Sequence, residues 1–117
     1  MADTLTAEAA PSFLCDLSAD ARAAVLLDPS GEQAGASEEG ERASRLAELT
    51  NELAEAIESA GGGGPVAEAE AQVPGGSVYL VRHEGWTLAV VARRSALSSL
   101  MLYDARTVLS RLAEAGS

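Results

Sequence analysis

The stretch Ser77–Arg94, SVYLVRHEGWTLAVVARR, decides the fold of this chain. It reads as two short strands joined by the two-residue loop Glu84-Gly85, in which Gly85 adopts a positive φ without steric cost. This loop length sets the register, so that His83 faces Trp86 and each earlier residue faces its counterpart on the second strand. Both faces of the hairpin are apolar except near the loop, whereas a sheet with one face in water alternates polar and apolar residues. Both faces therefore need a cover, and we expect helices above and below a small sheet.

The residues before the hairpin begin with a tail and a short helix. Residues 1–10 contain no Leu, Ile or Val apart from Leu5, and we expect them to form a flexible tail. Pro11 suits the first turn of a helix, and three large apolar residues follow within six positions. The length of 117 residues fits one compact domain, and we predict that it spans residues 11–117, after the tail.

Two strands are predicted next. Arg22–Asp28 (RAAVLLD) is apolar on both alternating sets, which indicates an interior strand beside the hairpin. The turn signal Asp28-Pro29-Ser30-Gly31 follows, because Asp bonds the backbone ahead, Pro presets φ, and Gly closes the turn. Glu32–Ser37 is a weak, polar strand, which favours an edge position.

The residues from Glu41 to Ala60 have helical periodicity. The apolar stripe consists of Leu46, Leu49, Leu53, Ile57 and Ala60, and the opposite face is acidic, with Glu48, Glu52, Glu55 and Glu58. The run Gly61–Pro65 ends this helix, since Gly fits the left-handed cap and Pro cannot continue the helix.

The segment Val66–Val73 (VAEAEAQV) alternates strictly, which predicts an amphipathic strand that lies at an edge or has one face near water. Val66, Glu68, Glu70 and Gln72 share one face, and the other face carries Ala67, Ala69, Ala71 and Val73. After the hairpin, Ser95 or Ser98 caps a final helix. Its apolar line contains Leu97, Met101, Ala105, Val108 and Leu112, flanked by Leu102 and Leu109.

The composition narrows the classes of partner. The formal net charge is −10, and all eight basic residues are arginines. Residues 1–72 carry most of the acidic excess, which opposes binding to phosphate backbones and anionic lipid. A single cysteine cannot form an internal disulfide, and the chain has no long apolar span. We expect a soluble, cytoplasmic protein that binds neither nucleic acid nor membranes.

Few residues offer chemistry. His83 is the one histidine, so it is expected to be a surface residue packing on Trp86 rather than a general base. Cys15 lies beside Asp16, which opposes a thiolate, so we expect a small core residue. The glycine run Gly61–Gly64 follows a helix instead of opening one, which argues against phosphate binding. No metal or cofactor site is predicted.

The order helix, two strands, helix, three strands, helix resembles the Roadblock/dynein light chain family, whose layout is related to longin and profilin domains. The resemblance rests on AAVLLDPSG, LAELTNELAEAI, the alternating strand before PGG, and SVYLVRHEGWTLAVVARRSALSSLMLYDARTVLSRL. It covers most of residues 12–115 as a pattern of apolar positions and turns. It implies an α+β fold, with a five-stranded antiparallel sheet between one long helix and two terminal helices.

The resemblance also implies a homodimer. Family members commonly join their third strands, here residues 66–73, into one continuous sheet with the long helices side by side. This assigns the dimer edge to Val66, Glu68, Ala69, Glu70 and Gln72, and a partner or dimer helix to Glu48, Glu52, Glu55 and Glu58. Pairing about Ala69 places Glu68 opposite Glu70 of the other copy, and like charges there destabilise a sheet. The pairing survives if the register differs, if arginines reach over the strand, or if this face is wet. We expect the dimer to tighten as pH falls toward the carboxylate range or as salt rises.

The functional expectation follows from the same resemblance. In bacteria and archaea such dimers typically bind and regulate small Ras-like GTPases, and in eukaryotes they serve as adaptors. We therefore predict a non-enzymatic scaffold that homodimerises and binds or regulates a small Ras-like GTPase. One alternative is a ligand-sensing module of profilin-like fold, which an apolar pocket near Trp86 and Tyr79 would favour. A small enzyme is the other, and it needs a cleft that gathers perturbed ionisable groups.

Overall fold

The computed structural model describes the chain except for residues 1–4, 60–65 and 116–117. The helices among the described residues are α1 (Ala10–Leu17), α2 (Glu41–Ser59) and α3 (Ser98–Ala115). The strands are β1 (Ala21–Leu27), β2 (Gln33–Ala36), β3 (Val66–Val73), β4 (Gly76–His83) and β5 (Trp86–Ala92). The strands form one antiparallel sheet in the order β2-β1-β5-β4-β3. The predicted element order and α+β class are confirmed.

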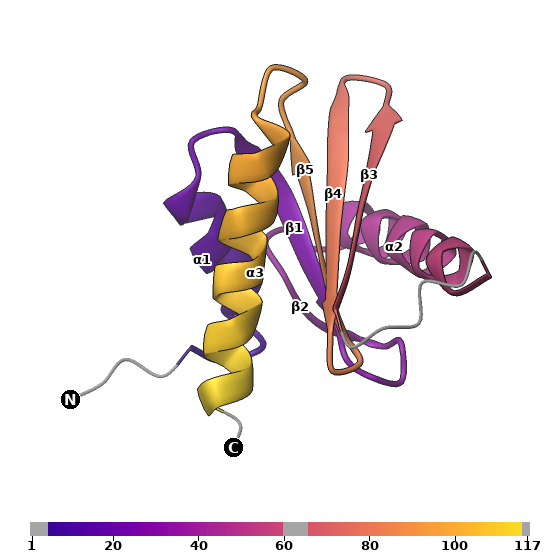
Figure 1. Ribbon diagram of the computed structural model, residues 1–117, viewed down its shortest axis with the longest axis vertical. Helices are drawn as coiled ribbons and strands as arrows, with labels where there is room; N and C mark the ends of the chain where they lie inside the picture. The colour runs from indigo at the N-terminus through magenta and orange to yellow at the C-terminus, as the bar shows by residue number, and fades with distance from the viewer. Residues whose placement is uncertain (1–4, 60–65, 116–117) are drawn as a thin grey trace.

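The sheet lies between helices on both faces. Helices α1 and α3 cover one face and α2 covers the other (Figure 1). The larger core cluster lies under α1 and α3 and includes Leu14, Tyr79 and Met101, all almost fully buried. A smaller cluster lies under α2 and includes Leu27 and Leu46. The two apolar faces of the hairpin therefore have the covers that the sequence predicts.

The β4–β5 hairpin has the predicted register. His83 pairs with Trp86, and the pairing continues without a shift to Ser77 opposite Ala92. The loop residues Glu84 and Gly85 have φ values of 51° and 87°. Positive φ at both central residues is the requirement of a type I′ turn, whose twist matches the strands on either side. Glu84 therefore adopts a left-handed conformation that the sequence pattern did not indicate.

Strand β1 lies in the sheet interior and β2 at an edge, as predicted. The turn between them is held by Asp28, whose Oδ1 accepts hydrogen bonds from the N–H groups of Ser30 and Glu32 at 2.9 and 3.0 Å. The N–H of Gly31 donates to the carbonyl of Asp28, and Gly31 has a φ of 89°. This turn brings residues 28–31 against the side of α2, where Asn51 Nδ2 donates to the Gly31 carbonyl at 3.2 Å.

Three details differ from the sequence expectation or lie outside it. Leu5 is buried in the larger core cluster and α1 begins at Ala10, so residues 5–10 pack on the domain instead of forming a free tail. A lone leucine has no periodicity that a pattern could detect, but its burial stabilises the fold. Leu97 precedes α3 and is 67% exposed, so it does not belong to the apolar line. The expected helix end at Ala60 and Gly61–Pro65 lies outside the described residues.

Candidate interaction surface

Strand β3 presents an open sheet edge. Among the described residues it pairs with β4 alone, over eight residues without a register shift. Of the devices that protect edge strands against pairing, it has no Pro, Lys or bulge, but it does carry the charged side chains of Glu68 and Glu70. The other edge is different, because β2 has four residues, and a Cβ at Gly35 would collide with the carbonyl oxygens of Ala7 and Glu8. Strand β3 is therefore the edge available for strand addition.

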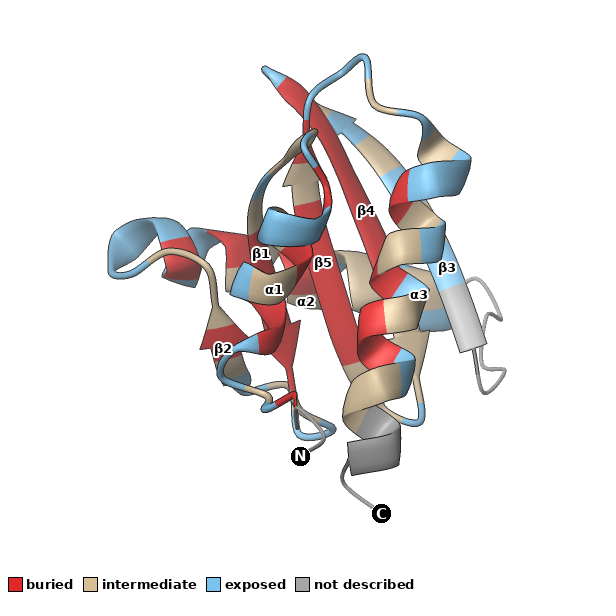
Figure 2. Ribbon diagram, turned by 90° about the vertical axis from the view of Figure 1, so that its left-hand side faces the viewer, coloured by how far each residue is buried: buried red, intermediate tan, exposed pale blue. Residues whose placement is uncertain are grey.

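The outer strand has a charged face and an alanine face. Glu68 and Glu70 lie on the α3 side of the sheet, and Ala69 lies on the α2 side between them, as the pairing of Glu68 with Val81 and Ala69 with Leu80 requires. Glu68 and Glu70 are exposed residues and Ala69 is half-buried, although the side chain of Glu68 alone is only 26% exposed. The described part of β3 has exposed and half-buried positions, in contrast to the mostly buried neighbouring strand β4 (Figure 2). Of the predicted dimer-edge residues, Gln72 shares the exposed face, and Val66 pairs with His83 through its backbone.

The glutamates of β3 have polar partners within the chain. Arg106 of α3 donates through Nη1 to Glu68 Oε2 at 2.7 Å. Gln72 Nε2 donates to Glu70 Oε2 at 3.2 Å, and Arg94 Nη2 donates to the carbonyl of Val73 at 3.2 Å. The sequence anticipated that an arginine could reach over this strand, but no local pattern identified which one, since Arg106 lies 38 residues from Glu68.

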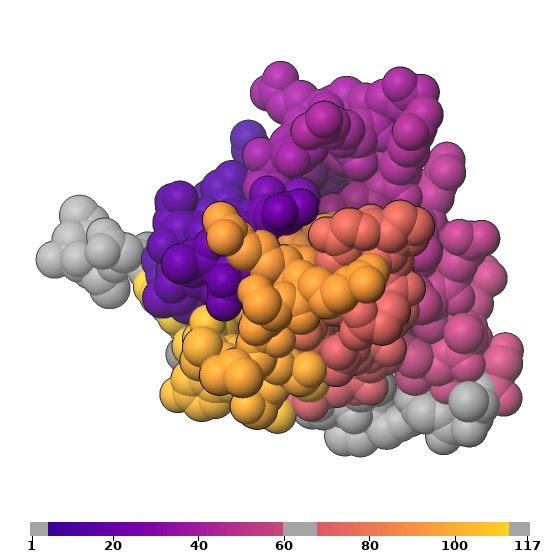
Figure 3. Space-filling view, turned by 90° about the horizontal axis from the view of Figure 1, so that it is seen from above, coloured from indigo at the N-terminus to yellow at the C-terminus, as the bar shows by residue number. Residues whose placement is uncertain are grey.

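Helix α2 is only partly buried against the sheet. Its buried residues, Ala43, Leu46 and Thr50, all lie in its first ten positions. Leu53 and Ile57, on the same predicted stripe, are half-buried. Seen from above, α2 runs along the outside of the molecule beside the β3–β4 segment (Figure 3). The second half of α2 therefore keeps apolar side chains that its own sheet does not fully cover.

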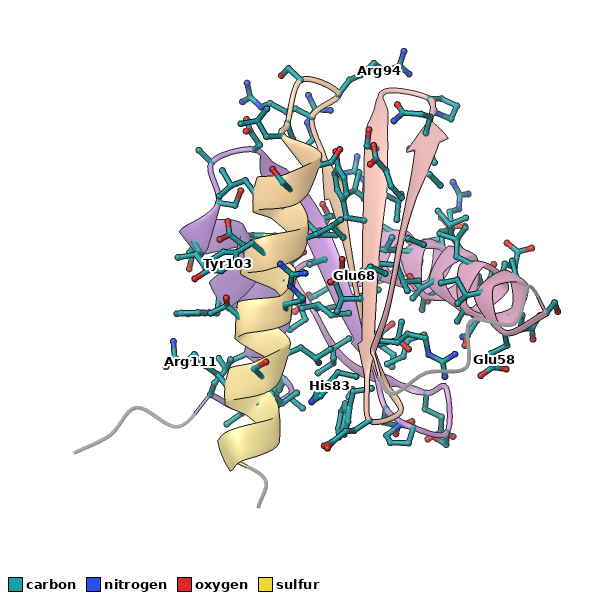
Figure 4. All side chains as sticks on the ribbon, viewed as in Figure 1. Glu58, Glu68, His83, Arg94, Tyr103 and Arg111 are labelled. Carbon is teal, nitrogen blue, oxygen red and sulfur yellow. The ribbon has the colours of Figure 1, made fainter. Side chains whose placement is uncertain are left out.

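The acidic face of α2 points away from the sheet. The predicted residues Glu48, Glu52, Glu55 and Glu58 are all exposed. Glu58 differs from the other three, because its Oε1 accepts a hydrogen bond from Arg82 Nη1 of β4 at 2.8 Å. Glu58 and Glu68 lie on opposite sides of the sheet (Figure 4). The predicted residues therefore form two separate groups, an acidic face on α2 and the edge strand β3, and these two elements lie beside each other (Figure 3).

Several solved structures share this architecture, and two of them are described as Roadblock/LC7 domains. A Roadblock/LC7 domain from Streptomyces avermitilis matches with a TM-score of 0.75 at 20% identity, covering 94% of this chain and 97% of that one. The chain has the Roadblock/LC7 fold. The gliding protein MglB of Thermus thermophilus matches with a TM-score of 0.68 at 18% identity, over 91% of this chain and 84% of that one. MglB of Myxococcus xanthus matches with a TM-score of 0.64 at 16% identity, over 92% and 84%.

Comparisons at the level of sequence give no match. No protein-family model matches the chain, and no curated protein does either. The Roadblock/LC7 fold is therefore established by three-dimensional similarity, at identities of 20% or less in the structures named above.

Two cavities lined by described residues are small. A cleft of about 160 Å³ lies between the second half of α2, the 28–31 turn and the Glu84-Gly85 loop, and is lined by Asn51 and Arg82. An apolar pocket of about 90 Å³ lies beneath α3 beside Val81 and His83. Typical ligand sites enclose roughly 300–1,000 Å³. Neither of these two cavities favours a ligand-sensing module, and Tyr79, which was expected near such a pocket, is buried.

The two residues considered for chemistry have ordinary structural surroundings. His83 is half-exposed at the hairpin end and pairs with Trp86. Burial raises the pKa of the Cys15 thiol, and the carboxylates of Asp16 and Glu38 raise it further, against a lowering hydrogen bond from Ser37. Within the described residues, no group of three or more His, Cys, Asp or Glu side chains is arranged to hold a metal ion. In the same part of the chain, no helix is long and apolar enough to cross a membrane.

Proposed function

We propose that this domain is a non-enzymatic scaffold that homodimerises through β3 and α2 and binds and regulates a small Ras-like GTPase, or acts as an adaptor. The observation that carries the proposal is the open β3 edge beside a helix that its own sheet covers only in part. The Roadblock/LC7 fold supports it, because dimerisation and GTPase regulation are what the resemblance to that family implies.

A second copy of the chain would cover both the open β3 edge and the partly exposed apolar side of α2. Pairing of β3 with β3 of the second copy satisfies the free backbone groups along the edge. The two copies in such a dimer are related by a two-fold axis through the paired strands. This axis brings the two α2 helices next to each other on one face of the continuous sheet. The half-buried side chains of Leu49, Leu53 and Ile57 then gain a second apolar surface, which adds roughly 25 cal/mol for each Å² removed from water.

The partner surface is the acidic face of α2. Glu48, Glu52 and Glu55 recur at spacings of four and three residues, so they form one line along the helix. They are exposed, and no ion pair among the described residues involves them. Carboxylates of this kind attract a basic partner patch and accelerate its association at low salt. A Ras-like GTPase with a basic docking surface is the proposed occupant.

Cysteine crosslinking tests the strand pairing. In a Cys15→Ser background, Ala69→Cys places two thiols opposite each other if the pairing is centred on Ala69. Mild oxidation is expected to give a covalent dimer, whereas Gln33→Cys on the β2 edge serves as the control and stays monomeric. Ala71→Cys forms a crosslink if the pairing is centred on Ala71 instead of Ala69. Absence of crosslinks at both β3 positions, with monomers in sedimentation equilibrium, would reject the dimer.

Charge reversal tests the partner surface. The double variant Glu52→Lys/Glu55→Lys should weaken binding to Ras-like GTPases of the same host by roughly ten-fold without changing thermal stability. Glu8→Lys/Asp16→Lys makes the same charge change at exposed residues in and next to α1, on the opposite face of the sheet from α2 (Figure 1), and is the matched control. Biolayer interferometry with each GTPase in its GDP form and in a non-hydrolysable GTP-analogue form gives the measurement. Equal affinity of both double variants would remove this face from consideration.

A further inference from the structure

When β3 pairs with β3 of a second copy, glutamates face each other in each of the three registers centred on Glu68, Ala69 or Glu70. When two copies continue one sheet, residues directly opposite each other lie on the same face. A pairing centred on Ala69 places Glu68 opposite Glu70 of the second copy, and symmetry makes this contact twice. A pairing centred on Glu68 or on Glu70 places that glutamate opposite its own copy. Glutamates therefore oppose each other whichever of these three residues lies on the two-fold axis, and like charges there destabilise the sheet.

Arg106 lies where this charge gathers. Its Nη1 is 2.7 Å from Glu68 Oε2, and its side chain remains 46% exposed above the open edge. A guanidinium has five N–H donors in a fixed fork, so one guanidinium serves two carboxylates. Directly opposite residues have Cβ atoms about 4.5–5.5 Å apart. A carboxylate of the second copy opposite Glu68 therefore comes within reach of the guanidinium that Glu68 already holds.

We propose that Arg106 is the neutralising residue of the self-pairing edge, where it bridges Glu68 of its own chain and Glu70 of the second copy. This inference rests on the proposed function, because it presupposes that β3 pairs with itself. In such a dimer four carboxylates meet two guanidinium groups. Without Arg106 the same four carboxylates meet no cation in the described structure, and the strand edge repels its own copy.

The other ionisable groups considered near this face of the sheet do not lie over the centre of β3, as Arg106 does. On β4, the neighbour of β3, the titratable residues of this face are Tyr79, which is buried, and His83, which borders the small apolar pocket together with Arg106. Arg94 donates to the carbonyl of Val73, the last residue of β3. Arg111 of α3 stacks on Phe13, 4.9 Å from its ring centroid, on the side of α3 away from Glu68 (Figure 4). Arg106 is thus the guanidinium placed over the centre of the strand.

Sedimentation equilibrium of a small variant set tests the proposal. Arg106→Gln should raise the dimer Kd about ten-fold, which corresponds to about 1.4 kcal/mol. Arg111→Gln, with the same charge change on the same helix, should leave the dimer Kd unchanged. Arg106→Lys keeps the positive charge but lacks the fork of N–H donors, so its dimer Kd should lie between those of the wild type and Arg106→Gln, which separates the charge effect from a folding defect. Thermal unfolding of each variant checks the fold.

Removing the opposed carboxylate should reverse the defect. Glu70→Gln added to Arg106→Gln is expected to restore the Kd to that of Glu70→Gln alone, since no repulsion then remains. Raising the salt from about 0.01 M to about 1 M shortens the screening length about ten-fold, so the Arg106→Gln dimer should tighten more than the wild type does.

Two results would overturn the inference: equal Kd values for Arg106→Gln and Arg111→Gln, or no rescue by Glu70→Gln. If either occurs while Ala69→Cys or Ala71→Cys still crosslinks, the β3 dimer stands and only the role of Arg106 is lost. If the wild type is monomeric and neither cysteine variant crosslinks, the dimer and the inference both fail.

Discussion

Arg82 of β4 and Glu58 of α2 form an ion pair, with 2.8 Å between Nη1 and Oε1, that ties the second half of α2 to the sheet. No residue of α2 after Thr50 is buried among those described, so this half is held by few apolar contacts. A second polar tie is the hydrogen bond from Asn51 to the Gly31 carbonyl. The helix that carries the proposed partner surface is therefore attached firmly at its start and by polar contacts further along.

The ion pair predicts a local loss of stability in Glu58→Gln. The Arg82 side chain is 23% exposed and that of Glu58 is 61% exposed, so solvent screens the pair in part. We expect a loss of about 0.5–1 kcal/mol in the free energy of unfolding. Hydrogen exchange should accelerate in residues 51–59 and not in residues 41–50. Glu48→Gln, which removes an unpaired glutamate of the same helix, should change neither quantity.

The hairpin loop predicts a stabilising substitution. Glu84 has a positive φ, which costs a residue with a Cβ roughly 1 kcal/mol, and Asn tolerates this conformation best among residues with side chains. Glu84→Asn should therefore raise the free energy of unfolding by about 0.5–1 kcal/mol in urea titrations. Glu39→Asn, which makes the same change at an exposed residue with ordinary φ, is the control.

The neighbouring glycine should behave in the opposite way. A Cβ at Gly85 would lie 3.1 Å from Pro29 Cβ, and its φ of 87° disfavours any side chain. Gly85→Ala should destabilise the protein by more than about 1 kcal/mol. A stable Gly85→Ala variant would contradict the type I′ geometry of the loop.

The turn between β1 and β2 predicts a pH dependence. Hydrogen bonds from the Ser30 hydroxyl and from nearby backbone N–H groups lower the pKa of Asp28 below its ordinary value. A carboxylate with a lowered pKa in the folded state contributes stability above its unfolded pKa of about 3.9, and the contribution is lost as pH falls through the folded pKa. The melting temperature of the wild type should exceed that of Asp28→Asn at pH 7, and the difference should shrink below about pH 4. A difference that stays constant with pH would mean that the charge of Asp28 plays no part.

The thiol of Cys15 predicts slow alkylation. Burial raises its pKa and so reduces the thiolate fraction at neutral pH. Iodoacetamide should modify the folded protein more slowly than the urea-unfolded protein at pH 7.5, by more than about ten-fold, and the rate should rise with pH. Asp16→Asn should accelerate the reaction only slightly, because burial is the larger cause. Rapid modification of the folded protein at neutral pH would reveal an activated thiol.

The sequence predicted which residues of the candidate surface share a face, but it did not predict how far α2 is buried. The alternation of Val66–Val73 was sufficient to place the glutamates of β3 on one face, because the period of a strand is two, and the structure shows which of the two predicted positions, an edge, the strand takes. The helical period likewise placed Glu48, Glu52, Glu55 and Glu58 on the exposed side of α2. The partial burial of α2 could not be predicted, since an apolar stripe shows which side faces the sheet and not how far along the helix the contact continues. The pairing of β3 with a second copy remains a prediction.

By itself, the sequence determined the three-layer fold, because Ser77–Arg94 is apolar on both faces and a two-residue loop allows only one register. It also placed β1 in the sheet interior beside the hairpin, since that segment is apolar on both alternating sets, whereas the structure decided that β1 pairs with β5. The tertiary structure decided which groups meet across the layers: Leu5 in the core, Glu58 with Arg82, and Glu68 with Arg106. Local periodicity reports which side of an element is buried, whereas a contact between residues 38 positions apart depends on how the helices lie on the sheet.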